Sequence, residues 1–276
     1  MSSAVSSMEK NQINLPRLPF TGVDTHAHLD REEFNSDLKE VLERAEANGV
    51  SHIGQVFLSF EDYQFNRVRF AEYGNIFMLL GIHPHDADKF TSAMLDQIQA
   101  AFEQDSRLKA VGEIGLDFYG NLSSREGQLR AFEQQLALAA RLDRPVVVHS
   151  REAFEQTMSR LLAAGFSGRQ VLWHCFGGGP DEAEQILEHG WHISIPGTIT
   201  FPKSDRLREA VAGIPVERLV LETDCPYLTP VPWRGRRNDP SYLPFTGLAV
   251  AEAKGMAPAE LWTACGDTAR KFFKVA

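Results

Sequence analysis

Short runs of apolar and β-branched residues alternate with longer amphipathic stretches about eight times along the chain. Such runs, bounded by Gly or Pro, are typical of parallel strands joined by helices. Eight repeats favour an α/β fold of the closed TIM (β/α)8 barrel type over an open doubly wound sheet. The predicted strands are Gly22–Thr25, His52–Leu58, Ile76–Ile82, Ala110–Ile114, Pro145–His149, Gln170–His174, Trp191–Ile195 and Leu219–Thr223. The predicted helices are Asp37–Asn48, Phe60–Tyr73, Ala93–Gln104, Ser124–Leu142, Phe154–Gly165, Asp181–His189, Ser204–Gly213, Pro244–Gly255 and Pro258–Phe273.

The length of 276 residues fits one such barrel, which commonly takes about 250 residues. We expect residues 1–18 to form a flexible N-terminal extension and residues 19–276 to form a single barrel domain. The extension has neither the basic region nor the apolar region of a signal peptide, and no apolar run approaches the roughly 18 to 20 residues that span a bilayer. These features predict a cytoplasmic protein without a membrane segment.

Charge and cysteine content narrow the function classes. The formal net charge of −9 argues against broad, nonspecific binding of duplex nucleic acid, which uses dense Lys and Arg surfaces. It does not exclude a phosphate substrate, because bound divalent cations can dominate the local field. The three cysteines, Cys175, Cys225 and Cys265, are too scattered for a disulfide framework, and we interpret them as packing residues.

Histidines and acidic residues recur at the carboxyl ends of the predicted strands. Two residues that are two apart on a strand point to the same side, so His26 and His28 can face one ion. In a TIM barrel these strand ends all converge on one face, where active sites are built. The four histidines and two acidic residues that meet there are His26, His28, Glu113, His149, His174 and Asp224.

The types of these six side chains predict a metal centre. Imidazoles and carboxylates suit Mg²⁺, Mn²⁺ or Zn²⁺, and six ligands fit two divalent ions that share a carboxylate better than one catalytic ion. Each residue alone also has a simpler interpretation, such as a hydrogen-bonded structural histidine. Acidic residues elsewhere, such as Asp117 and Asp181, are expected to cap a turn or a helix. The joint occurrence at one end of the strands favours metal binding.

Six segments between Val23 and Pro240 together resemble the TatD family of metal-dependent deoxyribonucleases, which have amidohydrolase-like TIM barrels. The segments are VDTHAHLD, GIHPHDA, VGEIGLDFY, VVVHSREAF, HCFGG and ETDCPYLTPVPWRGRRNDP. The resemblance implies the same six metal ligands and assigns catalytic roles to two of them. Glu113 would bridge the ions, and Asp224 would hold one ion and orient or deprotonate the attacking water. Asp239 departs from the family pattern, which usually has Glu before this proline, and the stretch GDTARKFF lacks the usual asparagine.

Two residues near the predicted centre are candidates for substrate binding. The resemblance suggests that His83 faces the site and donates a hydrogen bond to a phosphate oxygen, although it could also be a loop histidine braced by Pro84. Arg151 lies two residues after His149, a predicted ligand, so both side chains can point to the same face. Its guanidinium could then bind a phosphate through two hydrogen bonds. The alternative for Arg151 is a salt bridge to Glu152 or Glu155.

A basic run after the last predicted strand supplies a third candidate. Arg234 lies with Arg236 and Arg237 beside Trp233, and arginine next to an aromatic ring suits contact with a single nucleic acid strand. A solvated loop held by Asp239 is an equally good interpretation. We therefore assign Arg234 to substrate binding as a hypothesis.

The sequence favours phosphodiester hydrolysis in DNA, in its repair or degradation. From the resemblance, the expected activity is 3′–5′ exonucleolytic cleavage at single-stranded ends. The main alternative is a metal-dependent hydrolase of a small amide, lactone or other carbonyl substrate, since a fold does not determine a substrate. A third possibility is a subunit that keeps the metals but acts through a protein partner.

Overall fold

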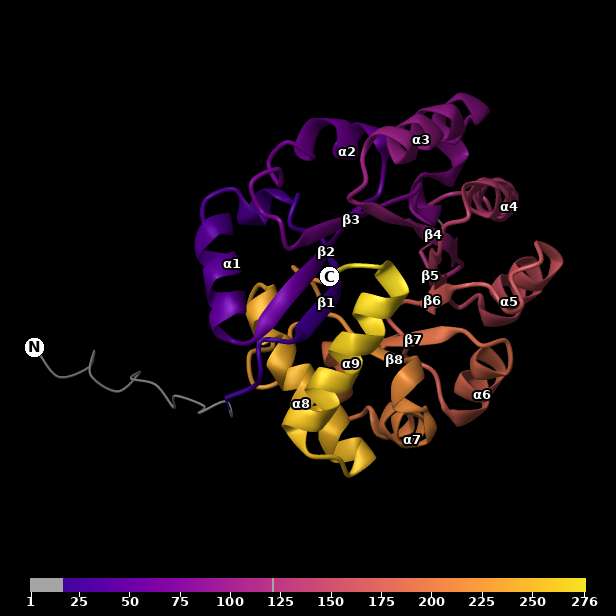
Figure 1. Cartoon of the computed structure of the whole chain (residues 1–276). Helices are drawn as coiled ribbons and strands as arrows, with labels where there is room; N and C mark the ends of the chain where they lie inside the picture. Colours follow the sequence, from indigo (N-terminus) through magenta and orange to yellow (C-terminus); the bar gives the residue numbers. More distant parts are fainter. Residues whose placement is uncertain (1–16, 121) are drawn as a thin grey trace, which may run out of the picture.

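Eight parallel strands close into a barrel, in the order β1 to β8 (Figure 1). The computed structural model describes residues 17–120 and 122–276, so residues 1–16 of the predicted extension lie outside the described residues. The barrel closes where β8 pairs with β1, and this confirms the predicted fold. The strands are β1 Gly22–Ala27, β2 Val50–Phe57, β3 Ile76–Leu80, β4 Leu108–Asp117, β5 Val146–Arg151, β6 Val171–Trp173, β7 His192–Ile195 and β8 Leu219–Leu221.

Helices surround the barrel and follow the strands in turn (Figure 1). Ser124 begins the longest of them by accepting a hydrogen bond from the Gly127 N–H, as a helix N-cap does. Within the described residues, no helix is long and apolar enough to cross a membrane. The α-helices are α1 Leu38–Ala47, α2 Phe60–Asn66, α3 Ser92–Gln104, α4 Arg125–Leu142, α5 Phe154–Ala163, α6 Pro180–Glu188, α7 Asp205–Gly213, α8 Leu243–Lys254 and α9 Pro258–Phe273.

The predicted helix Phe60–Tyr73 is too long, because α2 ends at Asn66. Residues 67–72 form turns with hydrogen bonds between residues three apart, such as Arg69 N–H to the Asn66 carbonyl at 2.9 Å. These tight turns still bury Phe70 and bring the chain directly to β3. Predicted strands also run too far, since β3 ends at Leu80 and not at Ile82. β6 and β8 end before the residues that we assigned as ligands, so His174 and Asp224 lie on the loops that follow.

One group of buried apolar side chains fills the barrel interior. Side chains from opposite strands can contact one another only inside a closed barrel, and this group draws on seven of the eight strands together with α9. The rings of Phe77 and Phe273 lie 4.6 Å apart, so the last turn of α9 covers one end of the interior. The members are Val23, Val56, Phe77, Leu79, Ala110, Val147, Leu172, Val220, Ala269, Phe272 and Phe273.

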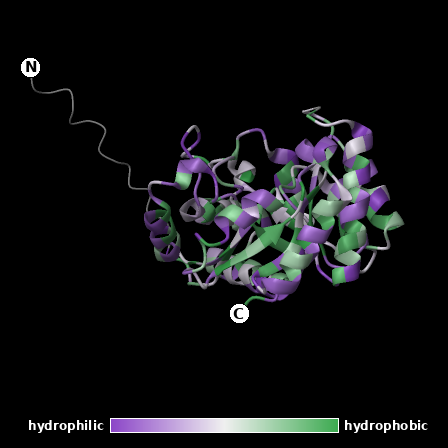
Figure 2. Cartoon of the chain, turned by 90° about the horizontal axis from the view of Figure 1, so that it is seen from above, coloured by the Kyte–Doolittle hydropathy of each residue, from purple (hydrophilic) through white to green (hydrophobic). Residues whose placement is uncertain are grey.

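Helix α9 can cover this end because small residues allow a close approach. A Cβ atom at Gly266 would lie 1.9 Å from the carbonyl oxygen of Thr21, and one at Gly22 would lie 2.0 Å from the ring of Trp262. A second apolar layer packs between the strands and the surrounding helices. Figure 2 shows the resulting distribution, with hydrophobic strands inside and mixed helices around them. The opposite end of the barrel stays free for polar side chains.

Candidate metal centre

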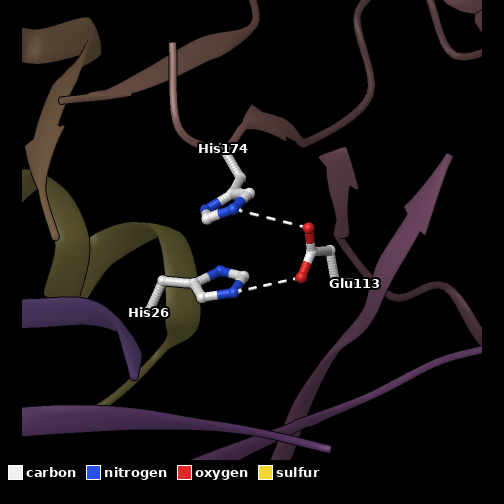
Figure 3. A group of neighbouring side chains, drawn as sticks. All are labelled: His26, Glu113 and His174. Carbon is white, nitrogen blue, oxygen red and sulfur yellow. Dashed lines mark ion pairs between the residues drawn. The ribbon is translucent and has the colours of Figure 1, made fainter. Parts of the chain in front are cut away.

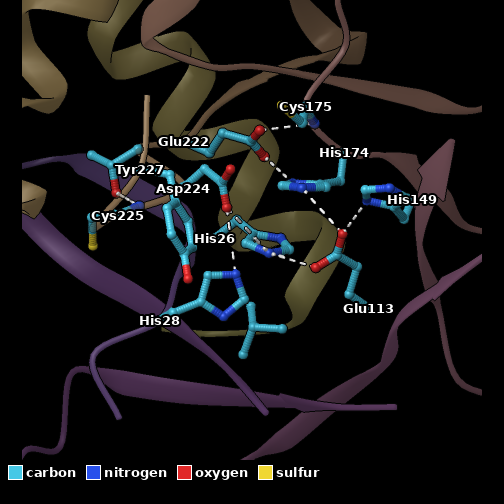
Figure 4. A network of polar contacts seen from close by, with 12 residues as sticks. His26, His28, Glu113, His149, His174, Cys175, Glu222, Asp224, Cys225 and Tyr227 are labelled. Carbon is cyan, nitrogen blue, oxygen red and sulfur yellow. Dashed lines mark hydrogen bonds and ion pairs between the residues drawn. The ribbon is translucent and has the colours of Figure 1, made fainter. Parts of the chain in front are cut away.

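The open end of the barrel gathers all six residues that the sequence assigned to metal binding (Figure 4). His26 lies on β1, and His28 follows the strand by one residue. Glu113 lies on β4 and His149 on β5. The sequence therefore predicted correctly that these side chains converge from different strands. The other two residues lie on loops: His174 follows β6 and Asp224 follows β8.

Glu113 lies between two sets of imidazoles and turns one oxygen toward each. Its Oε2 is 3.3 Å from His26 Nε2. Its Oε1 is 3.4 Å from His174 Nε2 and 2.6 Å from His149 Nδ1. The rings of His26 and His174 are stacked with centroids 3.6 Å apart, and Figure 3 shows both facing the same carboxylate. The two oxygens of one buried carboxylate thus belong to two different donor groups.

Asp224 completes the first of these groups. Its Oδ1 lies 3.4 Å from His28 Nε2 and 3.9 Å from His26 Nε2. The backbone of Asp224 has φ 55°, in the left-handed region that non-glycine residues seldom adopt. Cys175, which follows His174, has φ 49°. Strained backbone of this kind clusters at functional sites, where the surrounding fold holds it in place.

The distances between the donor atoms suit binding to a shared divalent cation better than direct hydrogen bonds between the side chains. Two ligands that are each about 2.1 Å from one tetrahedral ion lie roughly 3.4 Å apart, close to the separations between His26, His28, Glu113 and Asp224. Nε2 of His26, which faces Glu113 and Asp224, is buried and has no hydrogen-bond partner in the described part of the chain. Buried polar atoms are normally satisfied, so this nitrogen favours an ion at this place.

The charge states of Glu113, Asp224 and His26 are also appropriate for metal ligands. Burial raises the pKa of the Glu113 carboxyl, but nearby imidazoles, that of His174 foremost, hold this pKa well below its ordinary value. Burial also opposes ionisation of Asp224, but a hydrogen bond with His28 and the nearby imidazoles of His174 and His26 together outweigh burial and lower the pKa. Burial lowers the pKa of His26 and so favours a neutral imidazole. Ionised carboxylates and neutral imidazoles are the forms that bind metals.

Glu222 supports one of the proposed ligands from behind. It is fully buried, its Oε2 lies 2.9 Å from His174 Nδ1, and its Oε1 accepts the Cys175 N–H at 2.8 Å. This contact directs Nε2 of His174 toward Glu113 and helps to raise the pKa of His174 to about 10, against the effect of burial. Sequence analysis missed Glu222, although it precedes Asp224 by two residues, the same spacing that identified the histidine pair.

Asp117 does more than the predicted capping. Its Oδ1 accepts the N–H groups of Tyr119 and Gly120, as a turn cap does. Its Oδ2, however, lies 2.8 Å from His85 Nε2 and 3.2 Å from His149 Nε2. The prediction is therefore incomplete, because Asp117 ends β4 and projects from the same edge as the metal cluster. It orients two imidazoles at the rim.

His83 faces the cluster, as expected from the sequence. Its Nδ1 accepts the His85 N–H at 3.2 Å, so Nε2 carries the proton and lies 3.6 Å from Glu113 Oε1. Burial lowers the pKa of His83 to about 4, which keeps the ring neutral. The bracing role is also present, because His83 caps the short 3₁₀ turn that begins at Pro84.

The two candidate arginines differ in position. Arg151 lines the cavity above the cluster, and its guanidinium lies 3.9 Å from the ring centroid of Tyr119. Neither Glu152 nor Glu155 forms a salt bridge with Arg151 in the described part of the chain. Arg234 instead lies 4.1 Å above the ring of Phe201 and is not among the residues that line this cavity.

Other residues of the basic run are held by carboxylates outside the cluster. Arg237 binds Asp37 through both terminal nitrogens, at 2.8 and 2.7 Å. Asp239 pairs with Arg44 at 3.1 Å and accepts the Ser241 N–H at 2.9 Å. Asp239 thus helps to hold the loop, as the alternative interpretation expected, and Asp37 anchors it as well.

A cavity of about 970 Å³ opens above the cluster. It extends past Cys175 to the loop between β7 and α7. Such a volume lies at the upper end of the range for ligand sites, roughly 300 to 1,000 Å³. Buried imidazoles and carboxylates at the floor of an open cavity, on the carboxyl ends of barrel strands, define the active site of a metal-dependent hydrolase.

The comparisons with known proteins identify the family. The model of the family of TatD related DNases matches residues 23–274. The metal-dependent hydrolase YabD of Bacillus subtilis, whose description calls it uncharacterized, is 35% identical over 91% of this chain and 98% of its own length. The chain belongs to the TatD family, and it is a metal-dependent hydrolase of that family.

Two further similarities bear on fold and activity. A protein of Pantoea vagans described as the 3′-5′ ssDNA/RNA exonuclease TatD is 35% identical over 92% of this chain and 99% of its own length. The crystal structure of YJJV, a TatD homologue from Escherichia coli K12, superposes with a TM-score of 0.87 at 30% identity. That comparison covers 93% of this chain and 99% of the other.

Proposed function

We propose that this protein is a divalent-metal-dependent deoxyribonuclease that hydrolyses phosphodiester bonds as a 3′–5′ exonuclease on single-stranded DNA. The observation that carries the proposal is the shared carboxylate of Glu113, whose two oxygens face two separate donor groups. A site of two ions that share one carboxylate is typical of phosphodiester hydrolysis, where both the attacking and the leaving oxygen need stabilisation.

The six residues divide into two ligand sets. His26, His28 and Asp224 would hold one ion together with Glu113 Oε2. His149 and His174 would hold the other with Glu113 Oε1. Mg²⁺, Mn²⁺ and Zn²⁺ are all compatible with this mixture of nitrogen and oxygen donors.

Divalent cations bound here would lower the pKa of water and offset the charge of a phosphate. The ionised Asp224 then orients the attacking water and accepts its proton. The water oxygen forms a bond to phosphorus, the bond from phosphorus to the 3′-oxygen breaks, and the leaving oxygen takes a proton from solvent. His83, with its proton on Nε2, donates a hydrogen bond to a non-bridging phosphate oxygen.

The substrate contacts follow from the positions of the arginines. Arg151 lines the cavity and is held in place by the ring of Tyr119, so it can reach a phosphate next to the cleaved one. Arg234 lies outside the cavity lining and would contact only a strand that extends beyond it. The description of the Pantoea relative and that of the matching family support a nucleic acid substrate.

The direct test is a nuclease assay on 5′-end-labelled single-stranded DNA. The protein is stripped with a chelator and reloaded separately with Mg²⁺, Mn²⁺ or Zn²⁺, and the metal content is measured. We expect stepwise shortening from the 3′ end that stops on chelation and returns with metal. Turnover of a panel of amides and lactones, without any metal-dependent shortening of DNA, would contradict the proposal and support the carbonyl alternative.

A further inference from the structure

Three basic side chains line the cavity without an acidic partner. Within residues 17–120 and 122–276, Arg31, Arg151 and Lys203 form no salt bridge, and the Nε atom of Arg31 is buried without any hydrogen-bond partner. A fourth, Arg206, differs because Glu182 neutralises it at 3.2 Å. Glu113, Glu152, Glu182 and Asp224 also line the cavity, so these three cations stand out by their lack of an ion pair and not by an excess of positive charge.

These cations surround one side of the metal centre. Arg31 follows β1, Arg151 ends β5 and Lys203 follows β7. The loops after β6 and β8, which carry His174 and Asp224, lie between them in the order of the barrel. Positive charges therefore alternate with the proposed ligand loops along this half of the rim. That arrangement suits a chain of phosphates that leads to the centre better than a single neutral molecule.

An exposed aromatic ring lies in the same place. Tyr227 lines the cavity, is 49% exposed, and has its ring 6.1 Å from that of His28 (Figure 4). An exposed ring that lines a cavity offers a face on which a ligand can stack. A basic groove that contains exposed aromatic rings is how proteins bind single strands without regard to sequence, because every base has a face that can stack.

We propose that Arg31 and Lys203 bind phosphates on the 5′ side of the cleaved bond of a single strand, and that Tyr227 stacks on a base next to that bond. This inference rests on the proposed function and specifies its substrate as a polymer, which the enzyme holds at several phosphates. The contacts are electrostatic and stacking contacts, so they act on binding of the strand more than on the chemical step.

The test compares a polymer with a substrate that contains a single phosphodiester. Arg31→Gln and Lys203→Gln are assayed on a labelled oligo-dT and on bis(p-nitrophenyl) phosphate, with the same metal. For the oligonucleotide we expect KM to rise about 5- to 10-fold with little change in kcat. We also expect the slope of log affinity against log salt concentration to fall by roughly 0.7 for each lost charge. For the small diester, kcat/KM should change less than about twofold.

Two matched controls accompany these variants. Arg206→Gln removes a cation from the same cavity whose charge is already neutralised by Glu182, so it should change the oligonucleotide KM less than either variant. Tyr227→Phe keeps a ring that can stack, whereas Tyr227→Ala removes it. We expect the alanine variant to weaken oligonucleotide binding at least about fivefold and the phenylalanine variant to bind as the parent does.

Equilibrium binding separates failure of this inference from failure of the proposed function. Fluorescence anisotropy of a labelled oligo-dT is measured in an Asp224→Ala background, so no cleavage is required. Weaker binding on loss of Arg31 or Lys203 supports the inference even if no DNA is cut. Unchanged binding overturns it even if the parent is an active nuclease. Equal losses on the oligonucleotide and the small diester would also overturn it, because they would place these residues in the metal centre itself.

Discussion

The two ends of the barrel are made from the same strands but have opposite character. On β5, Val147 packs inside the closed apolar interior, and His149, two residues further along, reaches the metal cluster. In the same way Leu172 on β6 packs inside, and His174 just beyond the strand faces Glu113. In both cases only two positions along the chain separate a side chain of the apolar interior from one of the candidate metal centre.

What distinguishes the two ends is the element that covers them. Phe272 and Phe273 of α9 seal one end, where they pack against apolar side chains of the strands. The other end holds buried imidazoles and carboxylates around an open cavity, which loops and the first residues of α5, α6 and α7 line. Substitutions at the two ends should therefore separate stability from activity, and the following experiments test this in order of expected effect.

Removing Asp224 should have the largest effect. We expect Asp224→Ala to lower the hydrolytic rate on the order of 10³-fold, because the loss removes a proposed ligand together with the group that orients water. The far-ultraviolet circular dichroism should stay unchanged, since Asp224 lies at the rim and not in the packed interior. The matched control is Asp205→Ala on α7, whose side chain is 88% exposed. A variant at position 224 that keeps more than a tenth of the activity would contradict the assignment.

Phe272→Ala should show the reverse behaviour. Deleting a fully buried aromatic side chain costs about 3 to 5 kcal/mol of unfolding free energy, which urea denaturation measures. The rate per folded molecule should remain that of the parent, because the change lies at the sealed end. Phe65→Ala, at a position that is 82% exposed, should shift the unfolding free energy by less than about 0.5 kcal/mol. Loss of activity without loss of stability at position 272 would show that the two ends are coupled.

Glu222→Gln tests the contact behind the metal centre. The amide can still accept the Cys175 N–H or contact the His174 ring, but it lacks the charge that favours the proton on Nδ1. We expect metal affinity to fall about 10- to 100-fold, measured by competition with a chelator. Glu182→Gln, which changes a carboxylate at the rim of the same cavity, should leave metal affinity as it is. Equal affinities for the parent and the position-222 variant would rule out this orienting role.

His192 provides the smallest predicted effect and lies near the sealed end, with its ring 5.0 Å from that of Phe272. Burial, aided by Arg218, lowers the pKa of His192 to about 4 in the folded protein, against an ordinary value of 6.5. The unfolded chain therefore binds the proton first as the pH falls. Stability should decline from about pH 6.5 downward to about pH 4, by roughly 1 to 2 kcal/mol.

The variant His192→Gln should lose this part of the acid sensitivity. At pH 8 the histidine is neutral in both states, so the difference between parent and variant reports packing alone. Urea denaturation at pH 8 and pH 5 then isolates the titration, because the parent should lose more stability than the variant over this interval. An equal loss in both proteins would contradict a proton-linked contribution from His192.

The chain itself determined the barrel and the edge at which the proposed ligands lie. Eight alternations of strand and helix leave few other folds, and a His or an acidic residue at the end of a parallel strand must project from one edge. This reasoning placed His26, His149 and Glu113 correctly before any contact was known, because it needs only the strand period and the direction of the chain. It also placed Asp224, although β8 ends earlier than predicted.

Only the tertiary structure decided which side chains support or surround that set. Glu222 contacts His174 across 48 positions, and Arg31 and Lys203 come to one cavity from loops far apart in sequence. Strand periodicity describes the direction of a side chain but not its partner, and a salt bridge that forms or fails to form depends on the exact course of the loops. The closure of the barrel decides which side chains become partners, because it brings β1 beside β8.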